Sequence, residues 1–285
     1  FNGGPGSSSV WLHMGVLGPR RVVLTDDGEM PKPPFQLTDN QFSIFDETDL
    51  VFIDPMSTGF SRPVEGEKSK EWHTFTKDIQ SVGDFIRLYT TRYNRWLSPK
   101  FLAGESYGTT RAAGLSGYLQ DRHGMTLNGL MLISAVLDFT TIDFNLNNDL
   151  PYILFLPAYT ATAWYHGKLG FKAPLKTILK EAEEFAKGEY AAALLKGASL
   201  TPEERENIVE KLSRYTGISQ EFIRRSNLRI QDRHFFKELL RERGKTVGRL
   251  DSRFTGIDRI GVTESPEFDP LFAQVNGPYT AAFNE

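Results

Sequence analysis

The chain has no cysteine among its 285 residues, which excludes disulfide bonds, thiolate metal sites and a cysteine nucleophile. It also lacks an apolar run of the roughly 18 residues needed to span a bilayer, the longest being LMLISAVL from Leu130. Charge is nearly balanced, with 33 basic and 36 acidic residues, so no net field draws the protein to nucleic acid or to an anionic membrane. We therefore expect no nucleic-acid or membrane partner, and a peptide or small molecule as substrate.

Ordinary terminal signals are also absent. The sequence opens on FNGGPGSSS, without a methionine, a basic leader or a signal-peptide pattern. The last ten residues, NGPYTAAFNE, are typical of the beginning of a helix. We interpret the sequence as truncated at both ends.

Short β-rich runs alternate with helical patterns from Phe1 to about Asp138, which is typical of a mainly parallel sheet covered by helices. Residues 49–54, DLVFID, form a continuous apolar run before a Pro- and Gly-containing loop, which predicts a buried central strand. Apolar residues recur at three- and four-residue spacing between Phe75 and Tyr89, which predicts a helix with one buried face. The expected fold class is α/β.

The pattern becomes mostly helical, charged and rich in Ala and Leu after about residue 139. Thr201 and Glu204 fit a capping box, Pro202 occupies the favoured first helical position, and Gly217 predicts the end of that helix. We interpret residues 1–139 as the α/β core, 140–262 as an inserted helical cap, and 263–285 as a return towards the core.

The segment Gly104-Glu105-Ser106-Tyr107-Gly108 fits the pattern GxSxG. It follows the β-rich KFLA and precedes a helical pattern that runs to about Gln120, which is the strand, turn and helix that this motif requires. Ser106 is therefore the predicted nucleophile, and the Tyr107 amide, at a helix N-terminus, is the predicted donor to an oxyanion. The alternative is a serine that only caps a helix.

A Gly-rich stretch, Asn2-Gly3-Gly4-Pro5-Gly6, precedes the GxSxG motif. Small residues let a backbone approach a substrate closely, and a backbone amide stabilises developing negative charge. Gly4 is the candidate for the second oxyanion donor. The alternative is a tight turn without a ligand.

Three motifs, taken in order, resemble the successive signatures of the serine carboxypeptidases, peptidase family S10: NGGPGSSS followed by LGP, then IDPMSTGFS, then GESYG. The resemblance runs from Phe1 to about Asp138 and resumes faintly at NGPYTAAFNE. It implies an α/β-hydrolase fold with a helical cap, and removal of the C-terminal residue of peptides through an acyl-enzyme. Secretion or export to the periplasm is usual in that family.

The same resemblance implies roles for individual residues. Ser106 would attack the carbonyl, and the amides of Gly4 and Tyr107 would bind the oxyanion. Asn2 and Glu105 fall on positions that hold the terminal carboxylate of the substrate. Gly3 and the loop of Ser57 and Thr58 would line the substrate pocket, and Asp54 would position that loop.

Two departures from the family pattern stand near the Gly-rich stretch. Val16 occupies a position where many members carry a second carboxylate-binding glutamate. Arg20 or Arg21 is a possible substitute, the alternative being an ordinary exposed pair on a strand. Ser7 stands where a disulfide cysteine is common, which resembles the cysteine-poor bacterial branch.

The third departure concerns the triad, whose order in this fold is serine, acid, histidine. We expect the acid and the base beyond Glu285. Asp138, at the end of the strand after the GxSxG motif, is an alternative acid. No His and carboxylate cluster has metal-ligand spacing, so we expect neither a metal nor an organic cofactor. The histidines are expected to be surface or packing residues: His13, His73, His123, His166 and His234.

The leading hypothesis is a serine-type carboxypeptidase with an acyl-enzyme on Ser106. One alternative is an acyltransferase or esterase on the same scaffold, because a hydroxyl-bearing acceptor can replace water in deacylation. The other is a catalytically silent peptide-binding module, or a fragment that lacks the triad acid and base.

Overall fold

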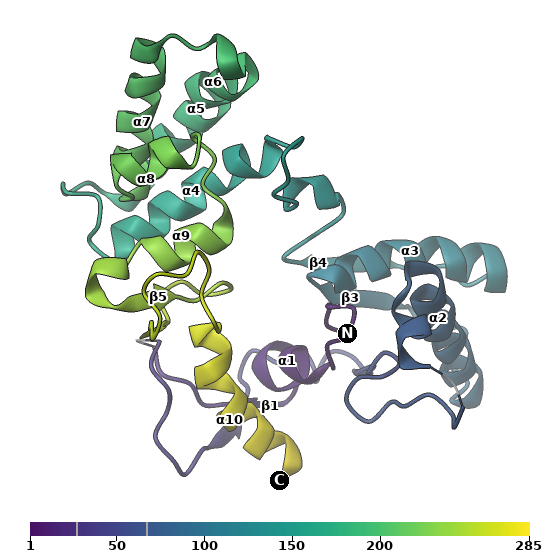
Figure 1. Cartoon of the computed structure of the whole chain (residues 1–285). Coiled ribbons are helices and arrows are strands. Elements are labelled where there is room, and N and C mark those ends of the chain that lie inside the picture. The colour runs from purple at the N-terminus through teal and green to yellow at the C-terminus, as the bar shows by residue number, and fades with distance from the viewer. Residues whose placement is uncertain (27, 67) are drawn as a thin grey trace. The chain divides into compact units, whose positions relative to one another are not determined.

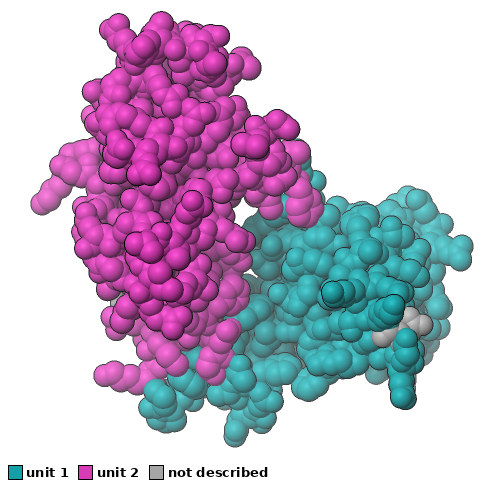
Figure 2. All heavy atoms as spheres, viewed as in Figure 1, with its two compact units in different colours: residues 1–23, 33–138, 278–285 teal, residues 24–32, 139–277 magenta. Residues whose placement is uncertain are grey.

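The computed structural model describes residues 1–26, 28–66 and 68–285, which divide into two units (Figures 1 and 2). Unit 1 comprises residues 1–23, 33–138 and 278–285. Unit 2 comprises residues 24–32 and 139–277. Most of unit 2 is thus one long stretch of sequence inserted between two parts of unit 1.

Unit 1 mixes helices with short strands. In chain order its elements are α1 (Val10–Leu12), the π-helix η1 (His13–Leu17), β1 (Arg20–Val22), β2 (Leu37–Asp39), the 3-10 helix η2 (Ser69–His73), α2 (Phe75–Arg92), β3 (Phe101–Glu105), α3 (Tyr107–His123) and β4 (Gly129–Ile133). Strands β1 and β2 pair antiparallel.

Strands β3 and β4 pair in parallel, in a register that places Phe101 opposite Gly129 and Glu105 opposite Ile133. The other edge of β3 bonds to the first residue of the chain. Phe1 N donates to Ala103 O at 3.0 Å, and Glu105 N donates to Phe1 O at 3.3 Å. These two bonds have the parallel pattern, so β3 lies between β4 and the segment that leads into the Gly-rich stretch.

Helices α2 and α3 pack side by side next to β3 (Figure 1). Two glycines allow the approach, since a Cβ on Gly114 would lie 2.8 Å from the Phe75 ring and one on Gly83 would lie 2.5 Å from the Tyr118 ring. The predicted helices are confirmed, with the first extending to Arg92. The apolar residues buried in this unit are Phe1, Ile79, Val82, Leu102, Ala112, Leu115, Leu119 and Met125.

The predicted central strand at residues 49–54 is wrong. This segment does not form a strand, and the Val51 side chain is exposed. A strand requires a hydrogen-bonded neighbour, and the segment is held instead through the Asp54 side chain. In the described part of the chain the strands form three two-stranded sheets, of which β3–β4 is the parallel one.

Unit 2 is mostly helical. Its elements are the 3-10 helix η3 (Phe139–Thr141), α4 (Leu150–Tyr165), α5 (Leu175–Phe185), the π-helix η4 (Ala186–Tyr190), α6 (Ala191–Lys196), the 3-10 helix η5 (Gly197–Ser199), α7 (Pro202–Thr216), α8 (Gln220–Arg225), α9 (Asp232–Glu238), the 3-10 helix η6 (Arg241–Arg243) and the antiparallel pair β5 (Lys245–Val247) and β6 (Thr255–Ile257). Helix α10 (Pro270–Asn284) runs from unit 2 into unit 1. The prediction that NGPYTAAFNE begins a helix is wrong, because this segment is the C-terminal part of α10.

The core of unit 2 surrounds α4, which is apolar on most of its circumference. The Tyr159 and Phe235 rings stack at 4.1 Å, and the buried Tyr190 hydroxyl donates to Leu228 O at 2.6 Å. The aromatic side chains therefore stabilise this core by packing against one another, and the buried tyrosine hydroxyl has a hydrogen-bond acceptor. Within the described residues, no helix combines the length and the apolar character that crossing a membrane requires.

The predicted capping box of α7 is confirmed. Glu204 N donates to Thr201 Oγ1 at 3.1 Å, and Thr201 N donates to Glu204 Oε2 at 3.0 Å. Gly217 ends the helix in the left-handed conformation, as predicted, and its N–H donates to Ser213 O. Four consecutive residues thus fix the start of α7 by local bonds alone.

Thr201→Ala is expected to lower the free energy of unfolding by about 1 kcal/mol, because the Glu204 N–H loses its side-chain acceptor. Thr201→Ser keeps that acceptor and is expected to match the wild type. Denaturant titration followed by circular dichroism measures both variants. Equal stability of the alanine and serine variants would contradict the prediction.

Candidate active site

Ser106 lies at the junction of β3 and α3 in a strained backbone conformation, with φ 56° and ψ −127°. Ser106 N donates to Ile133 O of β4 at 3.0 Å, and Thr109 N donates to Ser106 O at 2.9 Å. A non-glycine residue in such a conformation costs on the order of 1–3 kcal/mol and persists only where its surroundings hold it. Here the strand pair holds one side of Ser106 and the helix holds the other. The predicted strand, turn and helix are confirmed.

The two glycines of GxSxG are required by close backbone contacts. A Cβ on Gly104 would lie 2.1 Å from Gly108 O, and a Cβ on Gly108 would lie 2.8 Å from Phe1 O. Real Cβ atoms do not approach backbone atoms at these distances. The turn around Ser106 is therefore tight enough to exclude a side chain at either position.

The Gly-rich stretch packs directly on this turn. A Cβ on Gly3 would lie 2.5 Å from Tyr107 N and 2.8 Å from Glu105 O. Gly4 has φ +115°, which L side chains rarely adopt, and Ser7 N closes a turn by donating to Gly3 O at 3.0 Å. The structure thus places the backbone of Gly3 beside Glu105 and Tyr107, although these segments are about a hundred residues apart in sequence.

Asn2 and Glu105 are in direct contact. Asn2 Nδ2 donates to Glu105 Oε2 at 3.1 Å, and Asn2 Oδ1 accepts from Leu12 N at 3.1 Å. Asn2 is buried, while Glu105 is partly exposed. The amide is therefore fixed at one end by the last residue of α1, Leu12, and presents its other end to the carboxylate of Glu105, next to Ser106.

Asp54 joins the segment after the Gly-rich stretch to the loop of residues 55–61. Its Oδ1 accepts from Ser9 N at 2.8 Å and from Ser9 Oγ at 2.9 Å, and its Oδ2 accepts from Phe60 N at 3.3 Å. Gly59 is required here, since a Cβ would lie 1.9 Å from Asp54 Oδ2. The carboxylate thus holds the loop in place, as expected of it.

Ser57 and Thr58 lie in this loop. Thr58 is buried, and its hydroxyl donates to Pro55 O at 2.8 Å. Ser57 has φ 70°, and its buried hydroxyl has no hydrogen-bond partner among the described residues. The hydrogen bonds described for the chain do not join either residue to Ser106 or Glu105.

None of the histidines hydrogen-bonds to Ser106 Oγ in the described structure. His13 stacks on Phe52 at 4.2 Å, and burial lowers its pKa against the opposing effect of Asp54. His123 Nε2 lies 3.1 Å from Asp84 Oδ1. The remaining three are His73 at the end of η2, His166 after α4 and His234 in α9. Burial lowers the pKa of His166.

Three other residues that the sequence singled out lie away from these contacts. Arg20 is exposed and is 3.9 Å from Asp39 across the β1–β2 pair, which is the ordinary surface arrangement. The Nε of Arg21 is buried without a partner among the described residues. Asp138 does not end β4, because that strand ends at Ile133.

Sequence reasoning missed a buried ion pair behind the Gly-rich stretch. Arg111 Nε lies 2.8 Å from Asp78 Oδ2, with the two side chains 0 % and 3 % exposed. Arg111 falls on the face of α3 that also buries Ala112, Leu115 and Leu119, and Asp78 falls beside Ile79 on the buried face of α2. A charged residue at a buried position of a helical pattern was the available signal.

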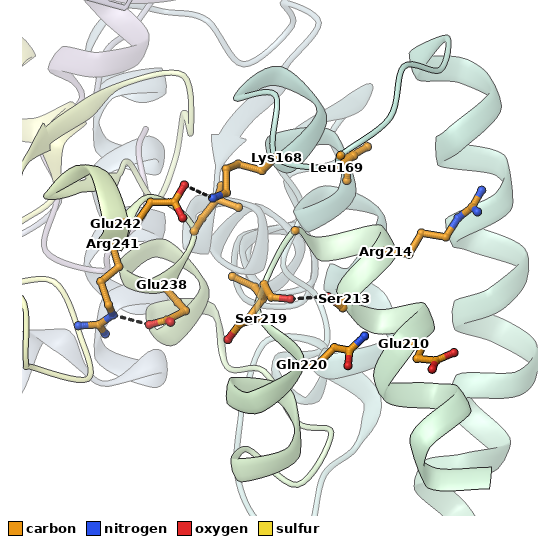
Figure 3. A pocket seen from close by; sticks show the side chains of 14 residues that line it. Lys168, Leu169, Glu210, Ser213, Arg214, Ser219, Gln220, Glu238, Arg241 and Glu242 are labelled. Atoms are coloured by element: carbon orange, nitrogen blue, oxygen red, sulfur yellow. Dashed lines mark hydrogen bonds and ion pairs between the residues drawn. The ribbon is translucent and has the colours of Figure 1, made fainter. Parts of the chain in front are cut away.

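The two described hollows lie in unit 2 and contain none of the predicted site residues. One, of about 600 Å³, is lined by residues of α7, α9 and their connecting loops (Figure 3). Two of its three cations pair within the lining, Lys168 with Glu242 and Arg241 with Glu238 (Figure 3), and the third, Arg214, pairs with Glu181. The other, of about 780 Å³, lies along residues 140–148. The described residues contain no group of three or more His, Asp or Glu side chains placed to hold a metal.

Comparison with known proteins identifies one family. The family model described as serine carboxypeptidase matches residues 1–193, which is more than half of the chain. The match continues beyond Asp138, to which the resemblance was expected to extend, and does not include NGPYTAAFNE. A search of curated proteins finds no match. The chain belongs to the serine carboxypeptidase family.

Proposed function

We propose that this protein is a serine-type carboxypeptidase that removes C-terminal residues from peptides through an acyl-enzyme on Ser106. The supporting observation is the strained Ser106 at the β3–α3 junction, with the Gly-rich stretch packed against it. Family membership supports the same chemistry at a coarser level. Amide hydrolysis needs a nucleophile and a preorganised oxyanion site, and these residues supply candidates for both.

In the proposed reaction, Ser106 Oγ forms a bond to the carbonyl carbon of the scissile peptide bond while a base takes the hydroxyl proton. The amides of Gly4 and Tyr107 bind the oxyanion, assisted by the N-terminus of α3. Collapse breaks the C–N bond, and the proton passes to the departing amine. Water then attacks the acyl carbon while the base takes a proton from it. The bond between Ser106 Oγ and the acyl carbon breaks, the proton returns to Oγ, and the shortened peptide leaves with a new carboxylate.

The proposal extends to the base, the fold and the arrangement of domains. We place the triad acid and base beyond Glu285, following the serine, acid, histidine order of the α/β-hydrolase fold. In that fold β3 and β4 belong to a larger parallel sheet, and the parallel bonding of Phe1 to β3 supports this. Residues 1–139 form the core, 140–262 the cap and 263–285 the return to the core.

The proposed specificity is for a free C-terminal carboxylate. Asn2 Nδ2 would donate to that carboxylate and Glu105 would share a proton with it, since these two side chains already lie 3.1 Å apart beside Ser106. Gly3, Ser57 and Thr58 are the proposed lining of the pocket.

Glu105→Ala is expected to raise KM for peptides with a free carboxylate about 10- to 100-fold, because hydrogen bonds to charged groups contribute about 1.5–3 kcal/mol. Hydrolysis of the matching amide or ester, which lacks the carboxylate, is expected to change little. The measurement is steady-state kinetics on N-blocked dipeptides and their C-terminal amides, using the protein from its complete gene. Glu47→Ala, which removes an exposed carboxylate of unit 1, is the control. An equal effect of Glu105→Ala on both substrates would contradict this role.

An acyltransferase or esterase on the same scaffold is the second candidate. The observation that favours it is Val16, an exposed apolar side chain where the family pattern often has a second carboxylate-binding glutamate. Transfer of an acyl group from an ester to an alcohol, without cleavage of peptides, would select it. Peptide binding without turnover would select the third candidate, the silent binding module.

A further inference from the structure

The guanidinium of Arg111 contacts both segments that carry the proposed oxyanion donors. Nη1 donates to Asn2 O at 2.6 Å, and Nη2 donates to Pro5 O at 3.3 Å. These two carbonyls flank Gly3 and Gly4. The Arg111 Cζ also lies 5.3 Å from the centre of the Tyr107 ring, so one side chain contacts the Gly-rich stretch and the residue that follows Ser106.

Asp78 of α2 holds this guanidinium from the other side. Its Oδ2 lies 2.8 Å from Arg111 Nε, and its carboxylate also hydrogen-bonds to the Tyr107 side chain. Burial, together with Asp78, raises the pKa of Tyr107 to about 12, so the phenol stays protonated and donates at neutral pH. The Phe1 ring completes the enclosure, with its centre 5.2 Å from Arg111 Cζ.

We propose that Arg111 and Asp78 form a brace that fixes the Gly-rich stretch relative to Tyr107 and thereby sets the spacing of the two oxyanion amides. This inference rests on the proposed function. Both are positioning residues, because they are buried and act through the backbone carbonyls of Asn2 and Pro5 and the side chain of Tyr107. A guanidinium suits the task, since its planar fork donates in several fixed directions at once.

The contacts explain why a lysine cannot replace Arg111. An ammonium on a flexible stem can keep the ion pair with Asp78, but it cannot reach the Asn2 and Pro5 carbonyls and stack on Tyr107 in one geometry. A carbonyl that loses its donor in a buried site draws the loop towards another partner. A shift of about 1 Å in catalytic groups lowers rates by about 10²-fold.

The test is kinetics of Arg111→Lys, Arg111→Met and Asp78→Asn in the protein expressed from its complete gene, well below the melting temperature of each variant. The brace predicts a fall in kcat of about 10²-fold with KM nearly unchanged, because the oxyanion amides bind the transition state more strongly than the substrate. Affinity for a peptide aldehyde, which forms a tetrahedral adduct, is expected to fall by a similar factor. Arg111→Lys is the key variant, because it retains the buried charge pair.

Lys237→Met is the matched control. Lys237 and Asp258 of unit 2 form an ion pair with the same side-chain exposures, 0 % and 3 %, and Lys237 Nζ also donates to a backbone carbonyl, that of Ile260. This variant is expected to melt at a lower temperature with an unchanged kcat. A similar fall in kcat in the control would mean that loss of stability, and not positioning, causes the effect.

Two results would overturn the brace. The first is a folded Arg111→Lys protein that keeps the wild-type kcat, or whose lower activity comes entirely from a higher KM, while Ser106→Ala is inactive. The proposed function would then stand without the brace. The second result matters if the wild type hydrolyses no peptide, so that the proposed function fails. Hydrogen exchange then tests the brace, which predicts that the Gly3, Gly4 and Tyr107 amides exchange faster in Arg111→Lys than in the wild type, while the exchange rates of the α2 amides stay the same. Unaltered exchange at these amides overturns the inference without reference to activity.

Discussion

Replacing Ser106 with alanine is expected to lower kcat for peptide hydrolysis by about six orders of magnitude, the scale observed when a triad serine is removed. The physical reason is that Ser106 carries the proposed attacking hydroxyl, which the strained backbone at the β3–α3 junction holds in place. Covalent labelling by a fluorophosphonate is expected to disappear with turnover. Both are measured on the protein from its complete gene, with mass spectrometry locating the labelled residue.

Ser116→Ala is the control for this change. Ser116 lies on α3, and its hydroxyl donates to the Ala113 carbonyl one turn away, at 2.7 Å, so its loss should leave turnover and labelling intact. Normal turnover in the Ser106→Ala protein, or a label on another residue, would contradict the assignment of the nucleophile.

Gly3→Ala is expected to lower kcat by about 10²- to 10³-fold, the loss that follows removal of one oxyanion donor. The new Cβ would lie 2.5 Å from Tyr107 N and 2.8 Å from Glu105 O, which are backbone atoms of the turn around Ser106. The Gly-rich stretch must then move away from Ser106, and the Gly4 amide moves with it. Kinetics on an N-blocked dipeptide, with circular dichroism to verify folding, measures the effect.

Gly6→Ala supplies a control in the same stretch. A Cβ there would find its nearest neighbour, His73 Cε1, at 4.0 Å, which is ordinary contact. We expect this variant to keep kcat within a few-fold of the wild type. Equal activity of the Gly3 and Gly6 variants would show that close packing of the Gly-rich stretch on the turn around Ser106 is not needed for turnover.

The sequence determined the local parts of this protein. The turn at Ser106 could be predicted because the GxSxG motif directly follows a β-rich run and directly precedes a helical pattern. Each of these three patterns depends on residues that are close together in the sequence. The same holds for the capping box of α7, where Thr201 and Glu204 satisfy each other's backbone donors. The order of three motifs also predicted the family, and the match of the family model to residues 1–193 confirms it.

The predicted strand at residues 49–54 marks the limit of such reasoning. Apolar composition reports that a segment tends to be buried, but a strand exists only where another backbone accepts and donates its hydrogen bonds. That condition belongs to the fold and not to the segment. The chain holds these residues through Asp54 and its bonds to Ser9 and Phe60.

Only the tertiary structure decided how the site is assembled. It brought Asn2 to Glu105 and the backbone of Gly3 to Tyr107, across about a hundred residues of sequence. It also revealed Arg111 and Asp78, which lie on different helices and which no spacing rule connects. Bonds between neighbouring residues can be predicted from the sequence. A buried ion pair cannot, because it depends on the packing that brings two distant segments together and removes water from both charges.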